Sequence, residues 1–398
     1  MRTYRITVLI GVIFSLCCTG QTSFNSSNIF DRILHNAAAD GIHLSALNFT
    51  DLVLREIVGI YDSAICSDNS SSKGGNGSRI DVHNHLVPDW YRSLVPVTGG
   101  NPTPQWNISS TFSFMESEDI GRSVLSFSSP GAAVFPGNRA KTLALARLMN
   151  EETAAYARSF TDKLSFMAVV PFPYINESIQ EARYALDELG AAGLVLLSSF
   201  EGKYLGDPAF AEFFRAVNGR EGRQIIFVHP GTPYLIVNGE LVEANPTRYP
   251  TGFLEFYFET ARTFQDLTVT QTLHNLSNLH WIVPHAGGAY PTIIDRILFG
   301  SFPALVNDTY DIMKTRLWYD TAGPTFLHQV GGLLAYDVSD SQILFGTDFP
   351  YVPQLSQPGS LQAILDSDFI DDAGKEGVFS MNAKGLFREN LFDQGCLH

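Results

Sequence analysis

The feature that most constrains the fold is a regular alternation of short apolar segments with helical patterns, which begins near residue 79. Eight segments rich in Val, Ile, Leu and Phe read as strands: residues 79–83, 122–127, 163–170, 193–197, 224–229, 279–285, 316–321 and 342–348. Helical patterns lie between most of them, for example at 140–160, 179–190, 208–219, 254–273 and 292–299. Strands alternating with helices predict a parallel α/β fold, and eight strands favour a closed (β/α)8 TIM barrel over an open doubly wound sheet.

Residues 21–78 precede this barrel and form an N-terminal helical extension. Helical patterns at 29–39 and 48–60 are followed by a polar, Gly- and Ser-rich run at 67–78, which is typical of a linker. A chain of 398 residues suggests two or three domains at roughly 150 residues per domain. The alternation instead predicts one barrel over residues 79–398.

Residues 1–20 have the form of a signal peptide. Arg2 and Arg5 stand before an apolar run at 6–18, and small residues follow it. The run is too short to span a bilayer. An uncleaved membrane anchor is the alternative. Eight glycosylation sequons support a secreted glycoprotein whose destination is the outside of the cell or a vesicle or vacuole lumen: Asn25, Asn48, Asn69, Asn76, Asn107, Asn176, Asn275 and Asn307.

Cysteine usage agrees with the secretory pathway. Cys17 and Cys18 would leave with the leader, so Cys66 and Cys396 are the remaining pair. We expect a disulfide between them that ties the extension to the C-terminus, with two unpaired thiols as the alternative.

The charge balance excludes several classes of partner. Lys and Arg number 26 against 41 Asp and Glu, for a net charge of −15, and no basic cluster interrupts this acidic balance. Nucleic acids and anionic membrane surfaces are therefore excluded as partners. The sequence contains no glycine-rich phosphate loop, which argues against a nucleotide cofactor.

Histidine and aspartate residues gather at the C-terminal ends of the predicted strands. His83 and His85 end the first, His229 the fifth and His285 the sixth, and Asp348 ends the eighth. Residues two apart in a strand point to the same side, and the C-terminal ends of barrel strands meet at the rim that carries active sites. Each residue alone has an ordinary structural explanation. Together, imidazole and carboxylate are the ligand set of Zn²⁺ or a similar divalent ion.

These segments resemble a known family. The resemblance rests on Val82-His83-Asn84-His85, Val228-His229-Pro230, the run from His285 through Ala286-Gly287-Gly288 to Pro291, Phe345-Gly346-Thr347-Asp348-Phe349-Pro350, and Gly99-Gly100-Asn101-Pro102 with Trp106. The chain is similar to the metal-dependent decarboxylases of the amidohydrolase superfamily, the aminocarboxymuconate-semialdehyde decarboxylase-like group, and within it to 6-methylsalicylate decarboxylases. The similarity covers about residues 79–392.

The resemblance implies a site and a reaction. His83, His85, His229 and Asp348 match the metal ligands, His285 matches the catalytic histidine, and the metal is one Zn²⁺ or Mn²⁺ ion. The predicted activity is non-oxidative decarboxylation of an ortho-hydroxy aromatic acid, with 6-methylsalicylate converted to 3-methylphenol in secondary metabolism. Either His285 or Asp348 delivers the proton, and a homodimer is expected. The chain departs from its family in its leader, extension and sequons.

Two further residues are candidates for substrate binding. Arg92, after the first strand, is predicted to pair with the substrate carboxylate, and Trp106 to contact its ring; the alternatives are a surface arginine and a core tryptophan. The rival function is a mononuclear metal hydrolase of an ester, lactone or amide, in which His285 would act as the base. The product distinguishes the two activities.

Overall fold

A computed structural model describes residues 26–67, 78–323, 326–352 and 362–391. Eight parallel strands form one sheet in the order β1-β4-β5-β6-β9-β12-β13-β14. Their bounds are β1 Arg79–Leu86, β4 Ile120–Phe127, β5 Leu164–Val169, β6 Gly193–Leu197, β9 Gln224–His229, β12 Leu279–Val283, β13 Leu317–Asp320 and β14 Ile343–Leu344. Each coincides with a segment predicted from the sequence, which confirms the (β/α)8 barrel.

The segment that follows β14 closes the barrel against β1. Val82 donates its N–H to the carbonyl of Phe345 (3.0 Å), and His85 donates to that of Phe349 (2.8 Å). Asp348 in turn donates to the carbonyl of His83 (2.8 Å). These hydrogen bonds hold residues 345–349 against β1 at the point where the metal-ligand candidates lie.

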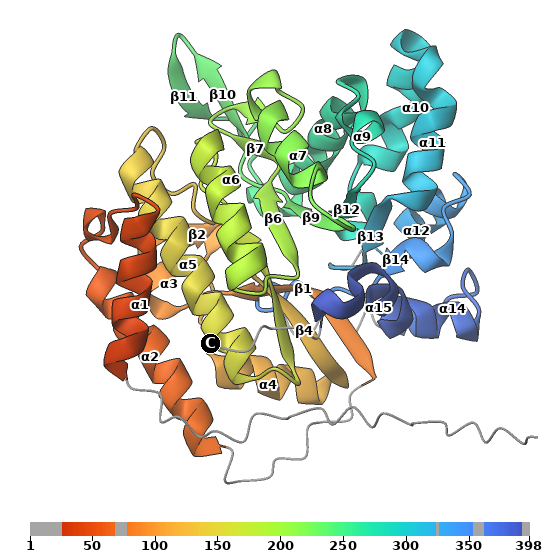
Figure 1. Ribbon diagram of the computed structural model, residues 1–398. Coiled ribbons are helices and arrows are strands. Elements are labelled where there is room, and N and C mark those ends of the chain that lie inside the picture. The colour runs from red at the N-terminus through yellow and green to blue at the C-terminus, as the bar shows by residue number, and fades with distance from the viewer. Residues whose placement is uncertain (1–25, 68–77, 324–325, 353–361, 392–398) are drawn as a thin grey trace, which may run out of the picture.

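Helices surround the barrel (Figure 1). Long helices follow several strands, because an apolar stripe on each one covers the buried outer face of a parallel sheet. The helices in chain order are α1 Ser26–Ala39, α2 Thr50–Ser67, α3 Asp89–Leu94, α4 Ile108–Ser117, α5 Arg139–Ser159, α6 Ile175–Arg183, α7 Ala211–Asn218, α8 Glu255–Val269, α9 Thr272–Asn275, α10 Tyr290–Ser301, α11 Val306–Thr315, α12 Phe326–Leu334, α14 Asp372–Glu376 and α15 Asn382–Phe387.

The described part of the extension packs directly on the barrel. Helices α1 and α2 lie beside α5, and residues such as Ile33 and Leu54 belong to the same apolar core as the strands (Figure 1). Arg147 of α5 is fully buried and contacts Asp40 of the extension at 2.6 Å and Glu181 of α6 at 2.9 Å. The extension is thus a layer added to one side of the barrel.

Three small antiparallel pairs were not predicted: β2 Val97–Thr98 with β3 Asn101–Pro102, β7 Ser199–Phe200 with β8 Lys203–Tyr204, and β10 Tyr234–Val237 with β11 Glu240–Glu243. The last is a hairpin that projects from the top of the molecule in Figure 1. They are inserted between barrel elements, so the alternation of strand and helix does not reveal them.

Several predictions fall on residues outside the described ranges. They concern the leader at 1–20, residues 68–77 of the linker predicted at 67–78, and the Cys66–Cys396 disulfide, since Cys396 is among those residues. Within the described ranges, no helix combines the length and the apolar character needed to cross a membrane.

Candidate metal centre and active site

Four of the predicted residues meet at the C-terminal rim of the barrel. His83 and His85 come from β1, His229 ends β9, and Asp348 follows β14; one ligand atom from each lies within 4.8 Å of all the others. The Nε2 atoms of His83 and His85 are 3.2 Å apart. Oδ1 of Asp348 is 3.1 Å from Nε2 of His85 and 3.5 Å from Nε2 of His83.

This arrangement fits a divalent metal ion. Ligand atoms bound to one ion at about 2.1 Å lie about 3.4 Å apart in a tetrahedron, which is close to the three spacings among His83, His85 and Asp348. The three imidazoles are buried and the aspartate is half-buried. Three imidazoles and one carboxylate suit Zn²⁺, Mn²⁺ or a related ion, and they leave room for a substrate oxygen.

Asp320, which the sequence analysis did not single out, orients two residues of the site. It ends β13, is fully buried, and its Oδ2 accepts a hydrogen bond from Nδ1 of His83 at 2.9 Å. Its Oδ1 accepts from the backbone N–H of His285 at 2.9 Å. The first bond directs Nε2 of His83 into the cluster, as carboxylates behind metal-bound histidines do. In the sequence, only the position of Asp320 at the end of a predicted strand indicates a role in the site. No neighbouring residue forms a recognisable motif with it.

Asp81, a residue of β1, has a similar supporting role. This carboxylate is fully buried and accepts hydrogen bonds from the N–H of His83 (3.1 Å), the side chain of Asn84 (3.1 Å) and both the N–H (3.1 Å) and hydroxyl (2.7 Å) of Thr347. Burial raises the pKa of Asp81 to about 6 despite these bonds. Asp81 thereby joins the strand that carries two ligands to the segment that carries Asp348.

The charges of the cluster prepare it for a cation. Burial alone would raise the pKa of Asp348, but the neighbouring imidazoles of His285, His83 and His85 hold it well below its usual range. Burial, and then the neighbouring imidazoles, lower the pKa of His229 far below its ordinary value. Burial also lowers the pKa of His85. An ionised carboxylate and neutral imidazoles are the protonation states in which these groups bind metals.

His285 stands beside the four-residue cluster. Its Nε2 is 4.0 Å from Oδ2 of Asp348, whereas the other oxygen of Asp348 faces His83 and His85. Its Nδ1 is buried and has no hydrogen-bond partner among the residues that the structure describes. The structure therefore brings all five predicted residues together, with His285 beside the four-residue cluster and outside it.

Asp348 and His285 both have strained backbone conformations. The φ angles of Asp348 (61°) and His285 (54°) lie in the left-handed region, which costs about 1–3 kcal/mol for a residue with a side chain. The turn after His285 also explains a glycine in its motif. A Cβ on Gly288 would lie 2.8 Å from the carbonyl oxygen of Tyr257, so only glycine permits this close approach to α8.

Aromatic rings that the sequence analysis did not single out border the cluster. Phe256 and Tyr257 of α8 lie against His229 and His285, with ring centroids 6.0 and 5.4 Å apart. The ring of Tyr351 is 5.4 Å from that of His85, and its hydroxyl is hydrogen-bonded to Ser128. These rings give the border of the cluster an aromatic, largely apolar character.

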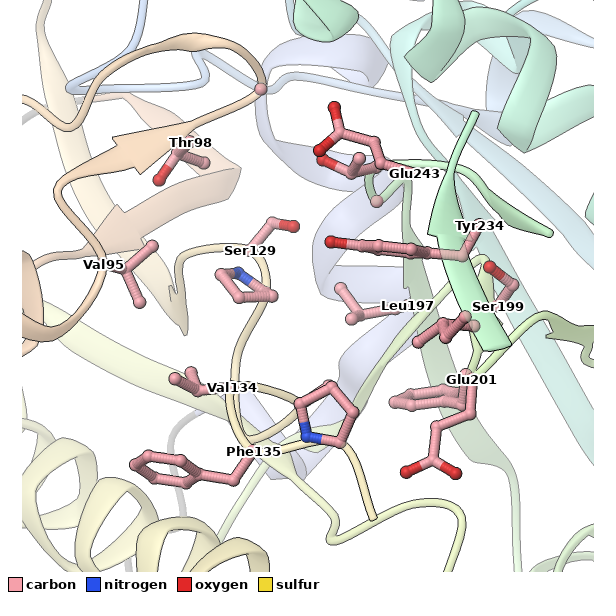
Figure 2. A pocket seen from close by; sticks show the side chains of 18 of the residues that line it. Val95, Thr98, Ser129, Val134, Phe135, Leu197, Ser199, Glu201, Tyr234 and Glu243 are labelled. Atoms are coloured by element: carbon pink, nitrogen blue, oxygen red, sulfur yellow. The ribbon is translucent and has the colours of Figure 1, made fainter. Parts of the chain in front are cut away.

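A cavity of about 490 Å³, shown in Figure 2, is lined by neighbours of the ligand candidate His229. Leu197 in its wall is the β-sheet partner of His229, and Gly231 follows that ligand by two residues. The closely packed turn at Gly99 and Gly100 also contributes, because a Cβ on Gly100 would lie 2.9 Å from Pro250. The Gly-Gly motif thus fixes one wall of the cavity against the segment before α8.

The two predicted substrate-binding residues lie elsewhere. Arg92 is on α3, where a guanidinium nitrogen is 3.4 Å from Asp89, and it is not among the residues lining the cavity. Trp106 is buried, with its ring centroid 5.7 Å from that of Tyr156 of α5, and is likewise absent from the cavity wall. Their roles toward a substrate stay predictions that this geometry does not favour.

Comparison with known proteins agrees with this picture. The profile of the amidohydrolase family matches residues 80–388, so the chain belongs to that family. A 6-methylsalicylic acid decarboxylase of Aspergillus aculeatus is 29% identical over 293 residues, which cover 69% of this chain and 85% of that protein. The predicted resemblance to the decarboxylases of this superfamily is confirmed.

Solved structures show the same fold. The crystal structure of an amidohydrolase II is 29% identical to this chain and has a TM-score of 0.70, and the match covers 78% of this chain and 99% of that one. A 5-carboxyvanillate decarboxylase of Novosphingobium aromaticivorans, solved with manganese, is 18% identical and has a TM-score of 0.64, covering 78% of this chain and 96% of its own.

Proposed function

We propose that this protein is a metal-dependent decarboxylase that removes CO₂ from an ortho-hydroxy aromatic acid without oxidation. The observation that carries the proposal is the cluster of three histidines and Asp348 with His285 beside it but outside the ligand set. The similarity to a 6-methylsalicylic acid decarboxylase makes 6-methylsalicylate the first substrate to test, with 3-methylphenol and CO₂ as products.

Decarboxylation of an aromatic acid needs an electron-rich ring. Loss of CO₂ from the intact ring would leave an electron pair on an sp² carbon, which is very unfavourable. If a proton first binds the carbon that bears the carboxylate, the carbon–carbon bond can break, its electron pair returns to the ring, and CO₂ leaves. A divalent cation held by His83, His85, His229 and Asp348 would supply a Lewis acid that favours the electron-rich, ionised form of the ortho-hydroxyl.

The residues of the chain then supply position and proton. Tyr257, Phe256 and Tyr351 border the site with aromatic rings, and His285 faces it from the side of Asp348 that is turned away from His83 and His85. A proton donor must lie within hydrogen-bond reach of the ring carbon. Nε2 of His285 lies 4.0 Å from Oδ2 of Asp348, so the two residues face the same space and both are candidates for the proton donor.

The test is product analysis. Full-length protein loaded with Zn²⁺ or with Mn²⁺ is incubated with 6-methylsalicylate and other ortho-hydroxy aromatic acids, and phenol and CO₂ are measured. The two metals in parallel also decide which ion supports activity, with Zn²⁺ as our proposal. If aryl esters, lactones or amides are cleaved while no acid loses CO₂, the protein is the rival metal hydrolase.

We also propose that the protein passes through the secretory pathway as a glycoprotein. Five of its sequon asparagines lie in the described ranges and all are exposed: Asn48, Asn107, Asn176, Asn275 and Asn307. Expression of the full chain in a eukaryotic host, followed by glycosidase digestion of the secreted fraction, tests this. A full-length protein that stays in the cytosol without glycans would overturn it.

A further inference from the structure

The cavity beside the metal centre has a wall of unusual composition for a protein that would bind an acid. Its described lining residues include no Lys, Arg or His. The ionisable side chains are those of Glu201, Glu243 and Tyr234, and apolar or small residues make up most of the remainder. A carboxylate placed here would meet two carboxylates of its own sign and no counter-charge.

The acidic residues stand at defined places around the cavity. Glu201 is fixed because one of its carboxylate oxygens accepts the N–H of Gly137 at 2.7 Å. Glu243 lies opposite Tyr234 in the β10–β11 hairpin, and Figure 2 shows the Tyr234 ring extending across the cavity toward Ser129. Burial, with the nearby charge of Glu243, raises the pKa of Tyr234, so its hydroxyl stays neutral.

The inner end of the cavity adjoins the metal centre. A smaller hollow shares Pro130, Leu197 and Phe200 with it and has the metal-ligand candidate His229 in its own wall. A substrate can therefore place its carboxylate and ortho-hydroxyl at the cation and direct a substituent on the neighbouring C6 of its ring into the cavity. The positive charge is at one end of the site and the negative charge at the other.

The volume exceeds what a methyl group requires. A methyl group takes up roughly the space of one water, about 30 Å³, whereas the cavity measures about 490 Å³. Sites for ligands of several tens of atoms typically measure roughly 300–1,000 Å³. Val134, Phe172 and Phe200 supply apolar surface along it, so a longer hydrocarbon substituent would gain contacts that methyl cannot make.

We infer that the cavity receives an uncharged, apolar substituent longer than methyl, so that the preferred substrates are alkyl-substituted ortho-hydroxy aromatic monocarboxylic acids, and that Glu201 and Glu243 exclude a second carboxylate. This inference rests on the proposed decarboxylase function and names the substrate class within it.

The experiment compares salicylates with 6-methyl, 6-ethyl, 6-propyl and 6-pentyl groups. We expect kcat/KM to rise about threefold to fourfold for each added methylene while the chain stays within the cavity. A matched compound, 6-(4-carboxybutyl)salicylate, has a similar length but ends in a carboxylate, and we expect at least a tenfold lower kcat/KM than for 6-pentylsalicylate. Equal rates for this pair, or a preference for methyl over every longer chain, would overturn the inference.

Two variants assign the effect to residues. Glu243→Gln combined with Glu201→Gln should reduce the discrimination between the pentyl and carboxybutyl compounds severalfold. Glu240→Gln removes an exposed carboxylate from the same hairpin, outside the cavity wall, and should leave the discrimination unchanged. If the double variant and the Glu240→Gln variant discriminated equally between the two compounds, Glu201 and Glu243 would have no part in excluding a carboxylate.

A binding measurement separates this inference from the proposed function. Titration calorimetry with 3-methylphenol and 3-pentylphenol reports on the cavity without any turnover. Tighter binding of 3-pentylphenol, in a protein that decarboxylates none of the acids, would retain the cavity assignment and reject the proposed function. Turnover of 6-methylsalicylate with no gain in binding or rate from longer chains would reject the cavity assignment alone.

Discussion

Nδ1 of His83 donates a hydrogen bond of 2.9 Å to Asp320, and both side chains are completely buried. Burial alone would lower the pKa of His83, but Asp320 and then Asp348 raise it to about 10, so these two carboxylates favour positive charge at this position. A divalent cation can provide that charge in place of a proton. The relationship links the seventh strand to the metal centre, although Asp320 is not itself among the four ligand candidates.

We predict that Asp320→Asn weakens metal binding by roughly 10- to 100-fold, because the substitution removes the charge that orients and polarises His83. Competition with a chelator, followed by metal analysis, measures this. Asp311→Asn, on the exposed surface of α11, is the matched control and should bind metal normally. Normal affinity in the Asp320 variant would show that the hydrogen bond only supports the fold.

Replacement of His285 should separate chemistry from metal binding. His285→Asn is expected to reduce kcat by roughly 10²- to 10⁴-fold, the usual contribution of a positioned acid or base. Its metal content should stay normal, since His285 lies outside the ligand cluster. His35→Asn, on the exposed surface of α1, serves as the control. A His285 variant with wild-type kcat would leave Asp348 as the proton donor.

A buried glutamate predicts how stability changes with pH. Glu152 of α5 is fully buried and accepts a hydrogen bond from Nε1 of Trp90 at 2.9 Å, while its other oxygen has no partner in the described part of the chain. Burial, together with the charge of Glu56, raises the pKa of Glu152 well above its ordinary value. The folded protein therefore holds a proton that the unfolded chain releases above about pH 4.5.

The free energy of unfolding should consequently fall as the pH rises from about 4.5 through the elevated pKa. Glu152→Gln keeps an acceptor for Trp90 and removes this dependence, so it should stabilise the protein at pH 8 by about 1 kcal/mol or more and have little effect at pH 4. Thermal melts of the variant and of Glu116→Gln, an exposed control, measure the difference. If the stability of the wild type instead rose between pH 4 and pH 8 more than that of Glu152→Gln, the predicted direction of the pH dependence would be wrong.

Much of the barrel and of its metal centre could be predicted because both follow from local patterns. Buried parallel strands are apolar along their length. His83 and His85 lie in the second half of β1, His229 ends β9, and Asp348 comes shortly after β14. The barrel brings these ends together. Asp320 also ends a strand, yet one carboxylate without a partner in sequence has no distinguishing pattern.

The cavity could not be predicted in the same way. Its wall combines loops with a hairpin at 234–243 that interrupts the alternation of strand and helix. Which loops meet depends on contacts between segments far apart in sequence, such as Gly99 accepting a hydrogen bond from Gly252 at 2.8 Å. The prediction for Arg92 and Trp106 rests on their side-chain chemistry alone, and the structure places neither in the wall.

The N-terminal extension gives the last prediction. Arg147 is buried between Asp40, on the extension, and Glu181, on α6, and its guanidinium lies 3.8 Å from the centre of the Tyr184 ring. Removal of one partner from a buried ion pair leaves an uncompensated charge and typically costs about 3–5 kcal/mol. Arg147→Met should therefore lower the free energy of unfolding by about that amount, because Glu181 is then buried without its cation.

Asp40→Asn should cost less, since Asp40 is partly exposed and its charge is screened by solvent. Chemical denaturation with two probes, tryptophan fluorescence and circular dichroism, checks both values and whether the extension unfolds together with the barrel. A single transition for both probes, shifted strongly by Arg147→Met, is expected if the extension is part of the folded unit. An earlier transition confined to the extension, with the barrel unaffected by the substitution, would mean that the two fold independently.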